Sequence, residues 1–147
     1  MRVNYESTVD WRMKTDLLRI NPSFHNQPRY DYAIIDAGGG TCFLAQLLYV
    51  FEVFAAKEER YMALILPFDE TIPRVNPTNQ VFRFTHVRSR HRSKSAFIDI
   101  NSIVWGALLV NSNDSAAGDE YLLFDVLDED FWYRMKSAKF VTTIHLH

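Results

Sequence analysis

The stretch Cys42–Phe68, CFLAQLLYVFEVFAAKEERYMALILPF, holds two apolar runs joined by a short charged segment. The first run, Phe43–Phe54, is apolar on both faces, which is typical of a strand covered on both sides. Lys57–Arg60 forms a polar tip, and Tyr61–Phe68 returns as a second strand ended by Pro67. The sequence therefore predicts a long β-hairpin around which the rest of the chain is built.

The segment before this hairpin has two interpretations. The apolar residues in Val9–Ile20 recur at spacings of four, four and three, which would place them on one face of a helix. The alternative is an irregular arm that wraps the domain, with Trp11 as its anchor. Pro22 and Pro28 favour the arm for residues 1–29, because the residue before a proline avoids the helical region.

A short strand, Tyr30–Asp36, and a turn, Ala37–Gly40, lead into the hairpin. Three glycines supply the positive φ angles that a tight turn needs. The segment Asp36–Thr41 resembles the phosphate-binding hairpin of the actin and heat-shock ATPases, where glycines let backbone N–H groups approach a phosphate. That superfamily needs two large lobes and a second such hairpin, so phosphate binding is the remote alternative and a plain turn the favoured one.

Turn signals divide the rest of the chain into short elements. We expect a loop at Asp69–Asn79, an alternating strand at Val81–Val87, a basic loop at Arg88–Ser95, a strand or strand pair at Phe97–Val110 bent at Asn101 and Ser102, a loop at Asn111–Asp119, a last strand at Glu120–Val126 and a short helix at Asp128–Lys136. Strands do not alternate with helices, which argues against a doubly wound sheet.

The fold expected from these elements is mainly β, a small distorted barrel of six to seven strands with an N-terminal arm and a short C-terminal helix. One domain is the default at 147 residues. It would comprise an arm (1–29), the barrel (30–136) and a tail or edge strand (137–147). The single cysteine, Cys42, and the lack of an apolar run of about 18 residues predict an intracellular protein, nuclear or cytoplasmic, without a membrane contact.

Charge is segregated along the chain although the net charge is only −2. Cations gather between positions 83 and 94 without an intervening acid, and seven acids without a cation lie between positions 114 and 130. Arginine forks and serine hydroxyls suit phosphate contacts. The candidate nucleic-acid-binding residues are Arg83, Arg88, Arg90, His91, Arg92 and Lys94. The alternative is that this loop is solvated or pairs with the acidic segment of its own fold.

Other candidate sites have plainer interpretations. Cys42 lacks a histidine at a suggestive spacing and is expected to be a strand cysteine rather than a nucleophile. The acids of positions 114–130 are expected to form a solvated face rather than a catalytic pair, and His145 and His147 alone make no zinc site, so no metal or cofactor is expected. Eight aromatic residues are expected to pack in the core, with a methyl-lysine cage as the alternative: Tyr30, Tyr32, Phe68, Phe84, Trp105, Tyr121, Trp132 and Tyr133.

Several runs of the sequence, taken in order and spacing, carry a family resemblance. They are Val9–Asp16, Ser23–His25, Pro28–Asp31, Phe43–Leu47, Ala63–Ile65, Pro67–Asp69, Ser102–Val110 and Asp125–Asp130. Over about residues 5 to 136 the chain resembles a domain of mushroom-forming fungi found in or beside transposase-like proteins of the Kyakuja–Dileera–Zisupton class. No RNase H-like catalytic set can be assigned, so this resemblance implies a non-enzymatic part of a transposon-type protein.

The chain also resembles, more distantly, the bromo-adjacent homology (BAH) domain of chromatin proteins, a distorted β-barrel. The likeness is positional: Phe43–Val53 leads into Met62–Phe68, and a later strand ends in Ile103–Gly106 before a last strand, Tyr121–Val126. It implies a non-catalytic reader or scaffold for histone tails, nucleosomes or other proteins. The segment Leu66–Phe68 lacks the Trp/Tyr-rich end of many such domains, which argues against a methyl-lysine cage.

The function expected from the sequence is therefore a non-catalytic chromatin or nucleic-acid interaction module, with DNA or a nucleosome as partner. The alternative is a protein–protein scaffold or oligomerisation domain without nucleic acid.

Overall fold

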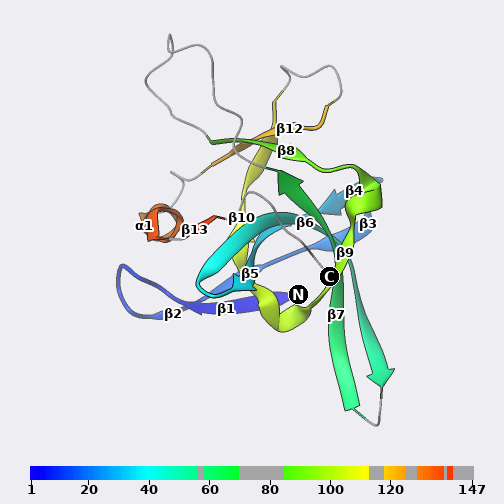
Figure 1. The fold of residues 1–147 in the computed structure, drawn as a ribbon, viewed down its shortest axis with the longest axis horizontal. Helices are drawn as coiled ribbons and strands as arrows, with labels where there is room; N and C mark the ends of the chain where they lie inside the picture. Colours follow the sequence, from blue (N-terminus) through cyan, green and yellow to red (C-terminus); the bar gives the residue numbers. More distant parts are fainter. Residues whose placement is uncertain (56–57, 70–84, 113–117, 125–128, 138, 141–147) are drawn as a thin grey trace.

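The computed structural model describes residues 1–55, 58–69, 85–112, 118–124, 129–137 and 139–140 (Figure 1). These residues form a mainly β fold with one α-helix, α1 (Glu129–Ser137), and two short 3-10 turns, η1 (Arg92–Lys94) and η2 (Ile100–Ser102). The predicted class and the C-terminal helix are thus confirmed.

The strands are short except for the central pair. In chain order they are β1 (Arg2–Glu6), β2 (Met13–Leu17), β3 (Ile20–Phe24), β4 (Gln27–Tyr30), β5 (Tyr32–Gly38), β6 (Thr41–Ala55), β7 (Glu58–Asp69), β8 (Thr85–Ser89), β9 (Ala96–Asp99), β10 (Ile103–Ala107), β11 (Leu109–Asn111), β12 (Glu120–Leu123) and β13 (Lys139–Phe140). The described residues therefore hold more strands than the six or seven expected.

The predicted central hairpin is present as β6 and β7, but β7 already begins at Glu58, within the predicted polar tip, and continues past Pro67 to Asp69. Its register runs from Ala45 opposite Pro67 to Ala55 opposite Glu58. A β-bulge near Leu47 inserts one extra residue into β6, which exchanges the faces of all later side chains. The two halves of the hairpin therefore have different surroundings. The near half, before the bulge, lies in the core, and the far half, between the bulge and the hairpin tip, projects from the body of the molecule (Figure 1).

The main sheet has the order β10-β5-β6-β7-β8-β12-β11, with β9 and β13 paired to β7 and β6. No hydrogen-bonded ladder joins its two ends among the described residues, so the expected barrel is not closed there. The end strands β10 and β11 are nevertheless separated by Leu108 alone. Because one covalent segment supplies both ends, the sheet must bend strongly back on itself.

Two hydrophobic cores lie on opposite faces of β5 and β6. Ile35 and Phe43 belong to the first, whereas Ile34 and Leu44 belong to the second, and all four are at most 5% exposed. Alternate side chains of a strand point to opposite faces, so burial of both sets requires cover on each side. The two-sided apolar pattern of the central strand therefore gave a correct prediction.

The N-terminal segment differs from both interpretations of its sequence. It forms two β-hairpins, β1–β2 and β3–β4, rather than a helix or an irregular arm. A positive φ at Trp11 and a bond from the Ser7 N–H to the Arg12 carbonyl (2.8 Å) shape the first turn. Trp11 is 73% exposed and anchors nothing; Val3 and Leu18 are buried in the first core instead.

Several downstream expectations hold in part. The predicted bend at Asn101 and Ser102 lies in η2, between β9 and β10. Most of the predicted strand Val81–Val87 lies outside the described residues, but β8 extends beyond its predicted end to Ser89. Of the segment 137–147, expected to be a tail or an edge strand, Lys139–Phe140 form the short strand β13, which pairs parallel with β6, and residues 141–147 lie outside the described ones.

Candidate functional site

The predicted basic loop is divided by the fold. β8 and β12 pair antiparallel, with Arg88 opposite Glu120. Arg88 forms ion pairs with Glu120 and with Asp119, the latter at 3.7 Å between Nε and Oδ2, and Arg90 pairs with Asp69. Two of the predicted phosphate-binding cations are therefore engaged by carboxylates of the same fold.

The rest of the predicted loop forms the turn η1. His91 caps it: the Nδ1 atom accepts a hydrogen bond from the Ser93 N–H at 3.3 Å. Arg92 and Lys94 are exposed, and among the described residues neither forms an ion pair. Arg83 lies outside the described residues, so two cations remain open to a phosphate in the described part of the site.

The glycine turn before β6 uses its polar groups internally. The Gly38 N–H donates to Asp36 Oδ1 at 2.7 Å, and the Thr41 hydroxyl donates to the Gly38 carbonyl at 2.7 Å. Gly38, Gly39 and Gly40 all have positive φ. These contacts are those of a hairpin turn that needs no ligand to hold its shape.

Cys42 is a buried strand cysteine, as expected. It is 7% exposed and lies in the second core. Burial, and to a smaller extent the charge of Asp36, raises the pKa of the Cys42 thiol to about 11. A thiol held protonated at neutral pH is a poor nucleophile. No group of three His, Cys, Asp or Glu side chains suited to a metal occurs in the part of the chain that the structure describes.

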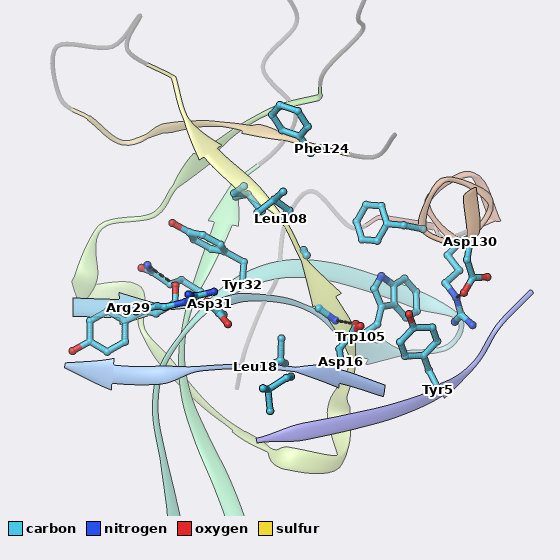
Figure 2. Close-up of a pocket in the computed structure, with 18 of the residues that line it drawn as sticks. Tyr5, Asp16, Leu18, Arg29, Asp31, Tyr32, Trp105, Leu108, Phe124 and Asp130 are labelled. Atoms are coloured by element: carbon cyan, nitrogen blue, oxygen red, sulfur yellow. Dashed lines mark hydrogen bonds and ion pairs between the residues drawn. The ribbon is translucent and has the colours of Figure 1, made fainter. Parts of the chain in front are cut away.

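A cavity of about 670 Å³ opens beside β10, and we call it the β10 groove. Its lining comes from both N-terminal hairpins, from β5 and β6, from the β10–β11 segment and from α1. In Figure 2, Arg29 and Asp31 lie at one end, Trp105, Tyr5 and Asp130 lie at the other, and Asp16 lies between them. The groove thus joins residues from segments that are far apart in the sequence.

The Trp105 end of the groove is built around a cation. The Arg134 guanidinium lies 4.6 Å from the ring centre of Tyr5 and 5.1 Å from that of Trp105. Asp130 holds this arginine at 3.5 Å and is itself only 1% exposed. The expectation that Asp130 belongs to a solvated acidic face is therefore wrong. An aromatic cage does form here, but the protein's own arginine fills it.

The middle of the groove presents a carboxylate. The Gly106 N–H donates to Asp16 Oδ2 at 2.8 Å, which fixes the side chain beside β10. Among the described residues no cation pairs with Asp16. Asp31, by contrast, is satisfied by Arg29 at 3.1 Å and by the Arg19 N–H at 2.8 Å. Asp16 is thus the acid of the groove that retains an uncompensated charge.

Five of the eight candidate cage aromatics lie in two groups; Tyr133 is exposed on α1, and Phe84 and the Trp132 side chain lie outside the described part of the structure. Tyr32, Phe68 and Tyr121 pack against one another with ring centres 5.3 to 5.8 Å apart, so these three contribute to the second core. Burial, followed by the neighbouring Tyr121, raises the pKa of Tyr32. Tyr30, Tyr32 and Trp105 also line the groove. These three residues come together through strand pairing, so their spacing in the sequence does not predict that they share a groove.

The groove residues that sequence reasoning missed lie in the N-terminal hairpin and in α1. Asp16 and Tyr5 belong to a segment expected to be a helix or an arm, and Arg134 belongs to a helix considered only for its caps. The alternation of polar and apolar residues in Arg2–Glu6 is the signal that would have found the first strand.

Comparison with known proteins adds no relative. No family model, no curated protein and no solved structure matches this chain. Within the described residues, α1 is too short to cross a membrane.

Proposed function

We propose that this chain is a non-catalytic interaction module that binds a basic peptide segment in the β10 groove. The observation that carries the proposal is the Asp16 carboxylate, which faces a cavity of about 670 Å³ with aromatic walls and has no cationic partner among the described residues. Binding sites of this kind combine apolar walls with a few placed polar groups. A lysine or arginine of the partner would supply the missing charge.

The chromatin setting of this proposal comes from the resemblance to BAH and Kyakuja–Dileera–Zisupton-type proteins. Histone tails are extended and rich in lysine and arginine, which suits the Asp16 carboxylate in the groove. Arg134 occupies the faces of Tyr5 and Trp105, so a methylated lysine would have no aromatic cage at that end. The proposed recognition therefore rests on charge and shape rather than on methylation.

Titration calorimetry with synthetic histone-tail peptides tests the proposal. Asp16→Asn keeps an oxygen that accepts the Gly106 N–H and removes the charge, so it should weaken binding by about tenfold, the typical worth of a charged hydrogen bond. Glu6→Gln makes the same charge change at an exposed position of β1 and should leave the affinity unchanged. Equal affinity of Asp16→Asn and the unaltered protein, or no binding of any tail, would reject the groove as the site.

A second candidate function is phosphate-backbone binding at η1. It is favoured by Arg92 and Lys94, which are exposed and free of ion pairs among the described residues. The pairing of Arg88 and Arg90 with acids limits this surface to weak contacts, because those two charges are already compensated. DNA or a nucleosome is the partner class proposed for it.

A further inference from the structure

The far half of the central hairpin carries an apolar surface that no described segment covers. After the bulge, alternate residues of β6 face away from the first core, and their register partners on β7 and β9 face the same way. One row joins Tyr49, Leu64 and Phe97, and the next joins Phe51 and Met62. We call these five residues the outer aromatic face.

Two residues of the outer aromatic face are largely exposed, and the other three are partly exposed. Tyr49 is 60% exposed and Phe97 is 62% exposed. The Tyr49 and Phe51 rings stack at 6.1 Å between centres, and Phe51 meets Phe97 edge-on at 5.6 Å. Contiguous apolar patches of this kind mark interaction surfaces.

The same half of the hairpin has an open strand edge. β5 pairs with β6 only over Thr41–Gln46, and the Leu47 N–H makes the last bond, to the Asp31 carbonyl at 3.0 Å. Beyond Leu47 no described strand pairs with that side of β6, and Figure 1 shows the ribbon projecting away from the other elements. Among the described residues β9 supports this half only over Met62–Ile65, so the hairpin toward its tip has two strands, and a long apolar edge invites a further strand.

We propose that the outer edge of β6 pairs with the same edge of a second copy, antiparallel and about a two-fold axis at Phe51. The open edge runs from Leu48 to the end of β6 at Ala55, so its middle falls between Phe51 and Glu52. Pairing about Phe51 uses nearly the whole edge, whereas a register centred nearer Leu47 meets the bond to Asp31. A two-fold interface requires such a self-complementary segment.

The side chains fit this register. Tyr49 lies opposite Val53 of the second copy, and Phe51 lies opposite Phe51, so the two outer aromatic faces become one. Glu52 lies opposite Val50. A register shifted by one residue pair, centred on Glu52, would set two carboxylates directly against each other, which destabilises a sheet. Charge and apolar pattern therefore select the same alignment.

Disulfide trapping in a Cys42→Ala background tests the register. Residues opposite each other in antiparallel strands have Cα atoms about 4.5 to 5.5 Å apart, within the range of a disulfide. Phe51→Cys should therefore form a covalent dimer under mild oxidation. Val53→Cys should not, because its two copies would lie about 14 Å apart along the strands.

Light scattering and sedimentation of the full chain test the association itself. The unaltered protein should have the mass of two chains, and Tyr49→Lys should have the mass of one with an unchanged far-UV circular dichroism spectrum. Trp11→Lys, which replaces an exposed aromatic residue in another hairpin, should remain a dimer. A monomeric unaltered protein would overturn the proposal. A dimer that survives Tyr49→Lys, or that cross-links through Val53→Cys instead of Phe51→Cys, would overturn it as well.

Discussion

Asp130 shows how a single carboxylate can join distant parts of this chain. It accepts hydrogen bonds from the N–H and the hydroxyl of Thr8, each at 2.6 Å, and it pairs with Arg134 one turn further along α1. These contacts tie the helix to the turn between β1 and β2. Burial raises the pKa of Asp130, but the Thr8 hydrogen bonds and the Arg134 charge outweigh it, so the pKa lies below its ordinary value of 3.8.

Asp130→Asn should lower the free energy of unfolding by about 3 kcal/mol, because it removes a buried negative charge that pairs with Arg134 and accepts both Thr8 hydrogen bonds. A depressed carboxyl pKa stabilises the folded state above the unfolded-state pKa, and this stabilisation disappears as pH falls through the folded-state pKa. The gap between the unaltered protein and Asp130→Asn should therefore narrow below about pH 4. Urea unfolding of both proteins at a series of pH values above and below pH 4 measures this difference in the free energy of unfolding.

Glu129→Gln is the matched control for this prediction. Glu129 is the exposed neighbour of Asp130 on α1, so its neutralisation should change stability by less than about 0.5 kcal/mol. Equal losses from both variants would show that Asp130 acts through the net charge of the helix rather than through its buried contacts.

At the scale of elements, the first hairpin is held against β10 by a close approach at Gly106. A Cβ atom at this position would lie 2.9 Å from Leu18 Cδ2 and 3.1 Å from Asp16 Oδ2. The absence of a side chain lets the hairpin lie against the sheet and lets Asp16 reach the Gly106 N–H. The residues of this contact, Asp16, Leu18 and Gly106, also line the β10 groove.

Gly106→Ala should therefore destabilise the protein by about 1 to 3 kcal/mol, the usual cost of overpacking a core. Leu18→Ala removes the nearer of the two obstructing atoms, so the double variant should lose less than the sum of the single losses. Denaturant unfolding of the four proteins gives this coupling. If the two single losses simply add in the double variant, the Leu18 side chain moves aside without an energetic cost, and its contact with Gly106 does not hold the hairpin in place.

At the scale of the whole molecule, the distribution of charge decides how the protein would meet a polyanion. The sequence carries a run of cations, but the fold brings acids from β7 and β12 against Arg88 and Arg90. The net charge of −2 adds no general attraction for a polyanion. Any phosphate contact in the described part of the site therefore depends on Arg92 and Lys94.

DNA binding measured against salt concentration tests this division. Two phosphate contacts give a slope of about −2 in a plot of log affinity against log salt. Replacing Arg92 and Lys94 together with alanine should abolish that dependence. Replacing Arg88 and Arg90 together should change the slope much less, since both are already paired with carboxylates. A larger effect from the second pair would place the interface on β8.

Local pattern was informative where neighbours in the sequence decide the structure. The apolar run of the central hairpin, the glycine turn and the acidic start of α1 all appear as expected. Local pattern did not predict the two hairpins of the N-terminal segment, because the spacing of its apolar residues fits a helix as well as a strand. Met13 and Leu17, which seemed to mark a buried helix face, are 68% and 53% exposed on β2.

The sequence alone was sufficient for the mainly β class and the two-sided burial of β6, because alternation and turn chemistry act between residues close in the chain. Tertiary structure decided the rest. The pairing of Arg88 and Arg90 with acids, the burial of Asp130 and the convergence of Asp16 with Trp105 all depend on which strands lie side by side. Strand order is set by contacts between distant segments, and no local spacing in this sequence encodes it.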